Sequence, residues 1–249
     1  LLLGLFLASI TIPLHALRLR RRPADLGLQP DGASHTVDAL PSALRGVSLR
    51  AALHGRAFWL FTLAFGLISV SAAAIRVHFI PFLMGSGIDS STAAFATGAI
   101  GIMQVVGRII FAPLDQRFST RSIVIGVFAL HIVALSILLV GQSMILIGMF
   151  ILIFGAAQGA VTLSRPSLVA ELYGVSHYGR ISSIMALFLT LTSTAAPLIA
   201  SLLYEGTGSY TPVLWMVVIF AGIATGVIIL AGRERDGTMR ESTAATQPG

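Results

Sequence analysis

Cysteine and lysine are both missing from this chain of 249 residues, and only 10% of its side chains are charged. The absence of cysteine excludes a disulfide framework and any metal site built from thiolates. The small charged fraction excludes an ordinary soluble domain, in which about 25% of the residues are charged. Because 55% of the residues are hydrophobic and the mean hydropathy is +0.90, polar side chains are too few to cover a water-facing surface. The composition therefore predicts a membrane protein.

Signals of soluble catalysis and of nucleic-acid binding are also missing. The sequence contains no metal-ligand cluster, no glycine-rich phosphate loop and no paired carboxylates, so we expect neither an enzyme nor a bound cofactor or metal. The net charge of +6 comes from sixteen arginines, and such a balance often indicates nucleic-acid binding. Here the arginines interrupt apolar runs instead of forming a patch, and this placement favours membrane topology over nucleic acid.

Seven apolar stretches are long enough, or nearly so, to cross a bilayer, which requires about 20 apolar residues. They are 1–17, 58–83, 92–114, 122–140, 143–164, 180–203 and 211–232. The chain begins inside the first stretch, without methionine, and its basic cluster follows the run rather than preceding it as in a signal peptide. We therefore expect 1–17 to be an incomplete span and the chain to be the later part of a longer polypeptide.

Arginines outside the spans fall in alternate connections. They occur in 18–57, 115–121, 165–180 and the tail after residue 232, whereas the intervening connections contain none. The positive-inside rule makes the arginine-containing side cytoplasmic, so the C-terminus is predicted to lie in the cytoplasm. The connections after residue 57 are short, which predicts that consecutive spans are antiparallel neighbours in a compact six-helix bundle.

Two segments are predicted to lie outside the membrane. The connection 18–57 begins with polar turn residues, and its part from 42 to 56 predicts a helix on the membrane surface, with a disordered basic linker as the alternative. The apolar side chains that this helix directs toward the lipid are Leu44, Val47 and either Leu49 or Leu53. The tail 233–249 consists mostly of polar and small residues, which predicts disorder.

The most informative stretch is 97–121, an apolar helix that ends in a short charged turn before the next span. The turn Ala-Pro-Leu-Asp-Gln-Arg-Phe-Ser-Thr-Arg resembles the loop signature Gly-x-Leu-x-Asp-Arg-x-Gly-Arg-Arg of the major facilitator superfamily. The positions that match in place or in kind are Ala112, Leu114, Arg117 and Arg121. Gln116 occupies the usual Asp position, and Asp115 stands one residue earlier.

The resemblance covers nearly the whole chain and implies two six-span halves joined by a long cytoplasmic loop. It implies an all-α membrane protein in which 1–17 is the last span of the N-terminal half, 18–57 is the linker and 58–232 is the C-terminal six-span bundle. It also implies a secondary transporter of a small solute in an inner cell membrane, working by alternating access. Its partners are then the lipid bilayer and the missing N-terminal half of the same protein.

Three further stretches, together with Gly107-Arg108, are similar to the branch of the superfamily that contains monocarboxylate and related organic-anion porters. The stretches are Arg22-Pro-Ala-Asp-Leu-Gly-Leu-Gln-Pro-Asp-Gly32, His78-Phe-Ile-Pro-Phe-Leu83 and Leu163-Ser-Arg-Pro-Ser-Leu-Val-Ala-Glu-Leu-Tyr-Gly174. In that branch an arginine placed like Arg108 faces the substrate path, so the resemblance implies an organic anion as substrate. Some members carry an acid where Gln104 stands, and this difference weakens a proton-coupled mechanism.

Ionisable side chains inside a span cost several kcal/mol unless they face a bundle interior or a water-filled cavity. Arg108 shares one helix face with Thr97 and Gln104, which favours an orientation toward the substrate path. The alternatives for Arg108 are an ion pair with the cytoplasmic charges and snorkelling to the surface. Arg76 either snorkels outward or lines the outer part of the path. The substrate-path candidates are Arg76, His78, Gln104, Arg108, Gln158 and Thr190.

Charged residues also gather at the predicted cytoplasmic ends of the spans. We predict a cluster that ties neighbouring spans while the path is closed on the inside and that breaks in the other half of the cycle. Its members are Asp115, Arg117, Arg121, Arg165 and Glu171. The resemblance implies that the span containing His131 lies at the periphery of the fold, so we predict a structural hydrogen-bonding role for His131. We expect Gly155 and Gly159 to serve close helix packing.

Three other functions fit part of the pattern. Seven spans with an inside tail suit a receptor, but the long first inner loop and the loop signature argue against one. An intramembrane serine protease requires Gly-x-Ser-Gly within a span, whereas Gly85-Ser-Gly87 lies in an outer connection. A drug or metabolite efflux pump of the same superfamily is the third alternative.

Overall fold

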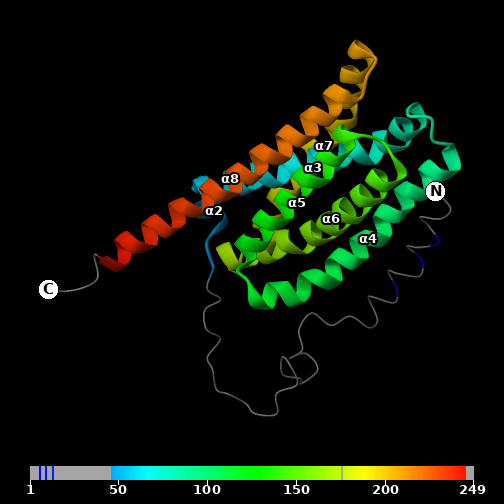
Figure 1. Ribbon diagram of the computed structural model, residues 1–249. Coiled ribbons are helices and arrows are strands. Elements are labelled where there is room, and N and C mark those ends of the chain that lie inside the picture. The colour runs from blue at the N-terminus through cyan, green and yellow to red at the C-terminus, as the bar shows by residue number, and fades with distance from the viewer. Residues whose placement is uncertain (1–5, 7–8, 10–12, 14–45, 175, 245–249) are drawn as a thin grey trace. The chain divides into compact units, whose positions relative to one another are not determined.

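The computed structural model describes residues 46–174 and 176–244, together with residues 6, 9 and 13, and the side chains of 232–244 are not described. The helices are α2 (Leu49–His54), α3 (Arg56–Gly85), α4 (Ser90–Arg117), α5 (Thr120–Val140), α6 (Met144–Tyr173), α7 (Tyr178–Thr207) and α8 (Thr211–Ala244) (Figure 1). All of these except α2 are long and apolar enough to cross a membrane, α8 being counted to Ala231. The prediction of an all-α membrane protein with a six-helix bundle is confirmed. The predicted span 1–17 and the linker up to residue 45 lie outside the described residues, apart from the three isolated positions.

Short polar side chains begin several of these helices. Asp89 accepts hydrogen bonds from the backbone N–H groups of Ser91 and Thr92 at the start of α4, at 3.1 and 3.0 Å. Ser119 and Ser143 cap α5 and α6 in the same way. These caps satisfy backbone donors that a helix leaves without a partner at its first turn. They explain why the connections between the spans need only a few residues.

Most helices are longer than the predicted spans, and α6 is one example. It continues beyond residue 164 to Tyr173, although Pro166 cannot donate a backbone hydrogen bond. Leu168 and Val169 are buried in the core, and this packing keeps the last turns helical. The helix ends at Gly174, whose φ of +70° is unfavourable for other residues. Part of the predicted connection 165–180 is therefore helix.

The helices are not packed in the order of the chain, so the predicted sequential neighbours are wrong in part. α4 packs mainly against α6, α3 packs against α7 and α8, and α5 contacts both α6 and α8. Of the consecutive pairs, α5 and α6 share a large interface, whereas α4 meets α5 and α7 meets α8 over small areas. A short loop holds only two helix ends together, and helices inclined to each other diverge beyond it.

Glycines allow α4 and α6 to approach until their backbones touch. A side chain at Gly107 would overlap the backbone carbonyl of Ala156, and one at Gly159 would overlap that of Gln104. Gly155 lies against Met103 in the same interface. Small residues at helix crossings are a common means of close packing in membranes, where apolar burial gives little drive for association. The predicted packing role of Gly155 and Gly159 is confirmed.

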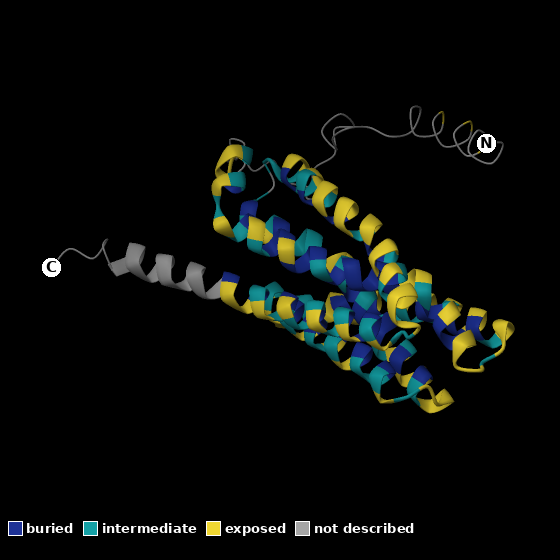
Figure 2. Cartoon of the chain, turned by 90° about the horizontal axis from the view of Figure 1, so that it is seen from above, coloured by how far each residue is buried: buried dark blue, intermediate teal, exposed yellow. Residues whose placement is uncertain are grey.

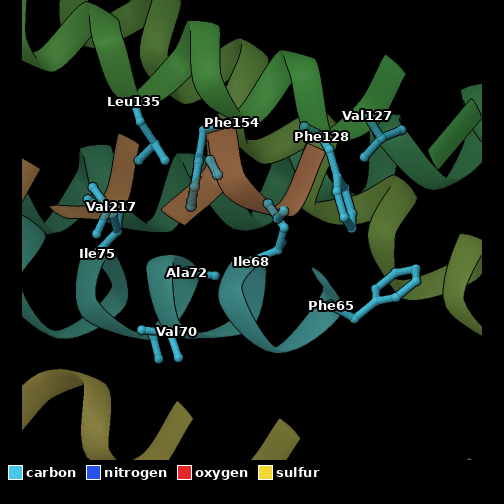
Figure 3. Packing of buried hydrophobic residues seen from close by; sticks show 14 of the residues in the cluster. Phe65, Ile68, Val70, Ala72, Ile75, Val127, Phe128, Leu135, Phe154 and Val217 are labelled. Carbon is cyan, nitrogen blue, oxygen red and sulfur yellow. The ribbon is translucent and has the colours of Figure 1, made fainter. Parts of the chain in front are cut away.

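Aromatic and aliphatic side chains fill the space between α3, α5 and α8. Figure 3 shows Phe128 and Leu135 of α5 and Ile68 of α3 directed into this space. The rings of Phe65 and Phe128 meet edge to face, with centroids 5.2 Å apart. Ser71 adds a polar link, because its hydroxyl bonds the backbone carbonyls of Leu67 and Val217. These contacts fix α3 against the outer helices.

The bundle covers its helices very unequally. Within its apolar segment, 72% of α3 is buried, compared with 22% of α4 and 17% of α7. α3 contacts both of these exposed helices, so the three are neighbours. Figure 2 shows buried residues where helices meet and exposed residues on their outer sides. Two transmembrane helices beside α3 therefore present most of their surface outside this chain's own packing.

The segments at the two ends of the bundle differ from the sequence prediction. α2 is shorter than the predicted surface helix 42–56, and its Leu49 and Leu53 pack against the core rather than toward lipid. The Val47 N–H donates to the carbonyl of Tyr173 at 2.9 Å and holds this segment to the end of α6. α8 continues as helix to Ala244, into the segment 233–249 that the sequence predicted to be disordered.

Candidate functional site

A cavity of about 220 Å³ lies between α3, α4 and α6. Its polar lining consists of Arg76 from α3, Thr97 and Gln104 from α4, and Gln158 from α6. The rest of the lining is apolar and includes the buried rings of Phe79 and Phe154. The residues around this cavity include one cation and no acid. The arrangement suits a small molecule with a negative charge and an apolar body.

Arg108 lies one residue after the backbone contact between α4 and α6 at Gly107. Its Nε donates to the hydroxyl oxygen of Thr162 on α6 at 3.2 Å, and that hydroxyl donates to the Gly159 carbonyl at 2.7 Å. Arg108 is exposed, and its side chain makes no ion pair with the described residues. It is absent from the lining of the Arg76 cavity. The side chain therefore reaches across to α6, and its charge is left unneutralised.

His78 is directed toward α7 and α8 rather than into the Arg76 cavity. Its Nε2 lies 3.1 Å from the Pro197 carbonyl oxygen, and its Nδ1 lies 3.5 Å from the Tyr210 hydroxyl. A neutral ring satisfies both contacts by donating from Nε2 and accepting at Nδ1. Burial, and secondly the neighbouring Tyr204, raises the pKa of the Tyr210 hydroxyl, so it stays a donor at neutral pH. The geometry gives His78 a bridging position between helices.

Thr190 also lies apart from the cavity. It is exposed on α7, and its carbonyl accepts hydrogen bonds from the hydroxyls of Ser193 and Thr194. A separate and almost wholly apolar cavity of about 220 Å³ lies between α3 and α7 and includes Trp59 and Phe188 in its lining. Of the six predicted substrate-path residues, the structure brings three into the lining of one cavity: Arg76, Gln104 and Gln158.

The five charged residues of the predicted gate do not form one bonded network in this conformation. Asp115 accepts a hydrogen bond from the Thr120 hydroxyl at 3.2 Å, and Arg121 donates from Nη2 to the Ile229 carbonyl at 3.0 Å. The side chains of the other three make no hydrogen bond or ion pair within the part of the chain that the structure describes; they are Arg117, Arg165 and Glu171. Both Arg165 and Glu171 lie on α6 rather than in a loop.

Two hydrogen bonds of the site could not be assigned from the sequence. Thr162 accepts a hydrogen bond from Arg108, and His131, which is not in the cavity lining, contacts Gln158 at 3.0 Å. Each pair is formed between different helices, so no periodicity within one helix reveals it. His131 is fully buried and hydrogen-bonded, as its predicted structural role requires. Within the described residues no group of three or more His, Asp or Glu is placed to hold a metal ion.

The profile of the Major Facilitator Superfamily matches residues 57–248, which include the whole six-helix bundle and the cavity. The chain belongs to this superfamily. It is therefore a multi-pass membrane protein of a transporter family rather than a member of an enzyme family, and the receptor and protease alternatives are not favoured. The match confirms the resemblance found in the charged turn after α4.

Curated relatives of the superfamily extend well beyond the length of this chain. Monocarboxylate transporter 12 of Rattus norvegicus is 26% identical over 173 residues, which are 67% of this chain and 36% of the rat protein. The protein of the same name from Xenopus laevis is 24% identical over 186 residues, 71% of this chain and 40% of its own length. An MFS-type transporter of Gibberella moniliformis is 25% identical over 142 residues, 56% of this chain and 33% of its own length. These matches support the expected similarity to the monocarboxylate-porter branch.

Proposed function

We propose that the chain is the C-terminal half of a secondary transporter that carries a small organic anion. The observation that carries this proposal is the pair of arginines within the membrane-crossing helices, Arg76 in the cavity and Arg108 beside it, neither of them bonded to an acid among the described residues. A cation at this depth is costly unless a ligand or a water-filled path compensates it. Guanidinium groups match carboxylates in shape and charge, so a carboxylate is the favoured substrate group.

The substrate class is further supported by the relatives named as monocarboxylate transporters. The aromatic lining from Phe79 and Phe154 supports an apolar body beside the carboxylate. Gln104 stands where some members of that branch carry an acid, so we propose no proton-carrying role for this position. The apolar cavity between α3 and α7 has no charged residue in its lining and gives an anion no favourable contact.

The transport path requires a second half, which we propose to be the N-terminal bundle of the same protein. The exposed surfaces of α4 and α7, which flank α3, supply the face for this half. We propose that the two halves rock about the bound substrate and open the cavity to either side in turn. The arginine distribution supports a cytoplasmic C-terminus in an inner cell membrane.

Replacement of Arg108 or Arg76 by glutamine tests the proposed function. In the complete transporter reconstituted in liposomes, we expect Arg108→Gln and Arg76→Gln each to raise the KM for lactate or pyruvate by about tenfold or more, because the countercharge is lost. Arg50→Gln is the control, since Arg50 is an exposed residue of the short helix α2. Unchanged KM values in normally inserted Arg108→Gln and Arg76→Gln proteins would refute the anion path.

We propose that the cytoplasmic charges act as a gate in the closed-inside state. Arg117 has no bonded partner among the described residues and is exposed, so it is available to pair with the opposite half. We expect Arg117→Ala to shift the protein toward the inward-open state, because the closed-inside state loses an ion pair. Accessibility of single cysteines placed at the two ends of the cavity measures this distribution. An unchanged distribution would remove Arg117 from the gate.

A further inference from the structure

His131 is a fully buried histidine that the proposed transport cycle does not use. It lies on α5, and its Nδ1 is 2.9 Å from the Val127 carbonyl oxygen of the same helix. Its Nε2 is 3.0 Å from the side-chain amide of Gln158 on α6. The ring of Phe154 packs edge-on against the imidazole, with centroids 5.5 Å apart. Both ring nitrogens therefore face a polar partner, and one partner lines the Arg76 cavity.

These contacts determine which nitrogen carries the proton. A carbonyl oxygen only accepts hydrogen bonds, so the contact with Val127 requires an N–H at Nδ1. A neutral imidazole has a single N–H, so Nε2 must then accept a hydrogen bond. The amide atom of Gln158 that faces Nε2 in the structure is Oε1, which satisfies only a doubly protonated ring. A half-turn of the amide exchanges its oxygen and nitrogen with almost no change in volume and satisfies the neutral ring.

The neutral ring is the favoured form in this position. An ionised group without an acidic partner is costly to bury. From α6, the ring is faced by the uncharged Gln158 and Phe154, and no described residue of the neighbouring helices provides a carboxylate contact. The charged group that shares the cavity with Gln158 is Arg76, whose positive charge also opposes a cationic ring. The amide nitrogen of Gln158 therefore donates to Nε2.

This arrangement fixes the other end of the Gln158 amide. The side chain has no hydrogen-bond partner besides His131 among the described residues. Its carbonyl oxygen consequently remains available as an acceptor in the wall of the cavity that Arg76 lines. Without His131, the amide could turn and offer either an oxygen or an N–H group. His131 thus determines that the oxygen of the Gln158 amide, rather than its N–H group, faces the cavity.

We propose that His131 is a positioning residue that holds the Gln158 carbonyl toward the substrate, so that the cavity selects carboxylates bearing a hydroxyl or amino group. This inference rests on the proposed function, with Arg76 or Arg108 binding the carboxylate. The Gln158 oxygen accepts the hydrogen bond from the substrate's donor group. A carboxylate without this donor leaves the Gln158 oxygen without a partner on the substrate, and a site built to hydrogen-bond a substrate group rejects the analogue that lacks it.

The hydrogen-bond arrangement can be tested without any substrate. The 249-residue chain, labelled with 15N-histidine and held in detergent micelles, gives ring-nitrogen signals by NMR, and His131→Leu identifies those of His131. At pH 7 we expect a protonated Nδ1 and an unprotonated Nε2, with the Nε2 signal displaced in Gln158→Leu. An imidazolium, a proton on Nε2, or no response to Gln158→Leu would overturn the proposal.

The selectivity is tested by uptake of two acids that differ by one hydroxyl, lactate and propionate, in the complete transporter. We expect the wild type to favour lactate by about tenfold or more in kcat/KM. In Gln158→Leu, His131→Leu and the double variant alike, this preference falls to about threefold or less. A role of His131 in stability alone would leave the preference intact and overturn the inference.

The two proposals fail in different ways. Failure to transport either acid, in protein that is normally inserted, would refute organic-anion transport, and the NMR result would still decide the hydrogen-bond arrangement. Equal transport of lactate and propionate by the wild type would leave the transporter assignment standing and refute the selectivity. His54→Leu is the control for loss of a histidine, since His54 lies at the end of α2.

Discussion

Asp89 is the acid that begins α4, the helix that carries Gln104 and Arg108. Its Oδ1 accepts hydrogen bonds from two backbone N–H groups, which favours the charged carboxylate over the protonated form. The Thr92 side chain and then the Thr92 backbone hold the pKa of Asp89 below its ordinary value. A carboxyl with a lower pKa in the folded state stabilises the fold above its unfolded pKa, and this contribution disappears as the pH falls through the folded pKa.

We predict that acid weakens the wild type more than the variant Asp89→Asn. The asparagine keeps an acceptor oxygen at the helix start but does not titrate. The melting temperature of the wild type in detergent should therefore exceed that of Asp89→Asn at neutral pH, and the difference should shrink as the pH falls below about 4. Thermal unfolding followed by circular dichroism measures both profiles. Parallel profiles down to low pH would contradict a role for the charge.

Individual site residues could be predicted from the sequence only in part. Arg76, Gln104 and Gln158 were identifiable because polar groups in apolar runs are rare and costly, and the structure gathers them around one cavity. His78 and Thr190 satisfied the same criterion but lie elsewhere, because a polar residue in a span can also serve contacts between helices. Hydrogen-bond partners across helices, such as Thr162 and His131, depend on packing that no local pattern encodes.

The α4–α6 pair is the element on which the cavity depends, and Gly107 is its point of closest approach. We predict that Gly107→Ala lowers stability by about 1–3 kcal/mol, because the added methyl group overlaps the Ala156 backbone. Gly101→Ala on the same helix is the matched control, since nothing lies within 4 Å of the added carbon. Alanine is the better helix former, so this control should be neutral or slightly stabilising. Unfolding by denaturant in micelles measures both, and equal effects would contradict the close contact.

At the level of elements, the apolar runs predicted all six membrane helices, because a bilayer demands a minimum apolar length. The ends of the helices, and the pairs of helices that pack together, were harder to predict from the sequence. α6 passes Pro166 because Leu168 and Val169 beyond it are buried in the core. The pairing of α4 with α6 follows from glycines on both helices, whose effect becomes visible only when the two surfaces are brought together.

The proposed N-terminal half should cover a stripe of α4 that this chain leaves exposed. Phe95, Ile102 and Ile109 are spaced by seven residues, lie on one side of the helix and are all strongly exposed. The chain has no cysteine, so a single introduced thiol gives an unambiguous label. We predict that Ile102→Cys reacts with a maleimide in the micelle-bound chain and about tenfold more slowly when the N-terminal half is present, because burial slows a thiol.

A cysteine on α5, a helix that we do not expect to face the N-terminal half, provides the control for that measurement. Val133 is half exposed on α5, a helix packed between α6 and α8, and we expect Val133→Cys to react equally in both preparations. Equal protection of both cysteines would indicate a general effect of the micelle. Equal reactivity of Ile102→Cys with and without the N-terminal half would mean that α4 does not face it, and the proposed arrangement of the halves would be wrong.

The bare-backbone contact between α4 and α6 has a mechanical consequence for the proposed transport cycle. Two helices that meet without intervening side chains cannot slide or roll without opening a gap, so we expect α4 and α6 to move as one rigid unit. Gln104 and Arg108 lie on α4 and Gln158 lies on α6, so we expect their mutual spacing to stay constant through the proposed cycle. We expect bending to be concentrated where the spanning helices share small interfaces, at α4–α5, α6–α7 and α7–α8. We therefore expect the α4–α6 side of the substrate path to stay rigid. The affinity for the substrate would then change through movement of the side that faces it.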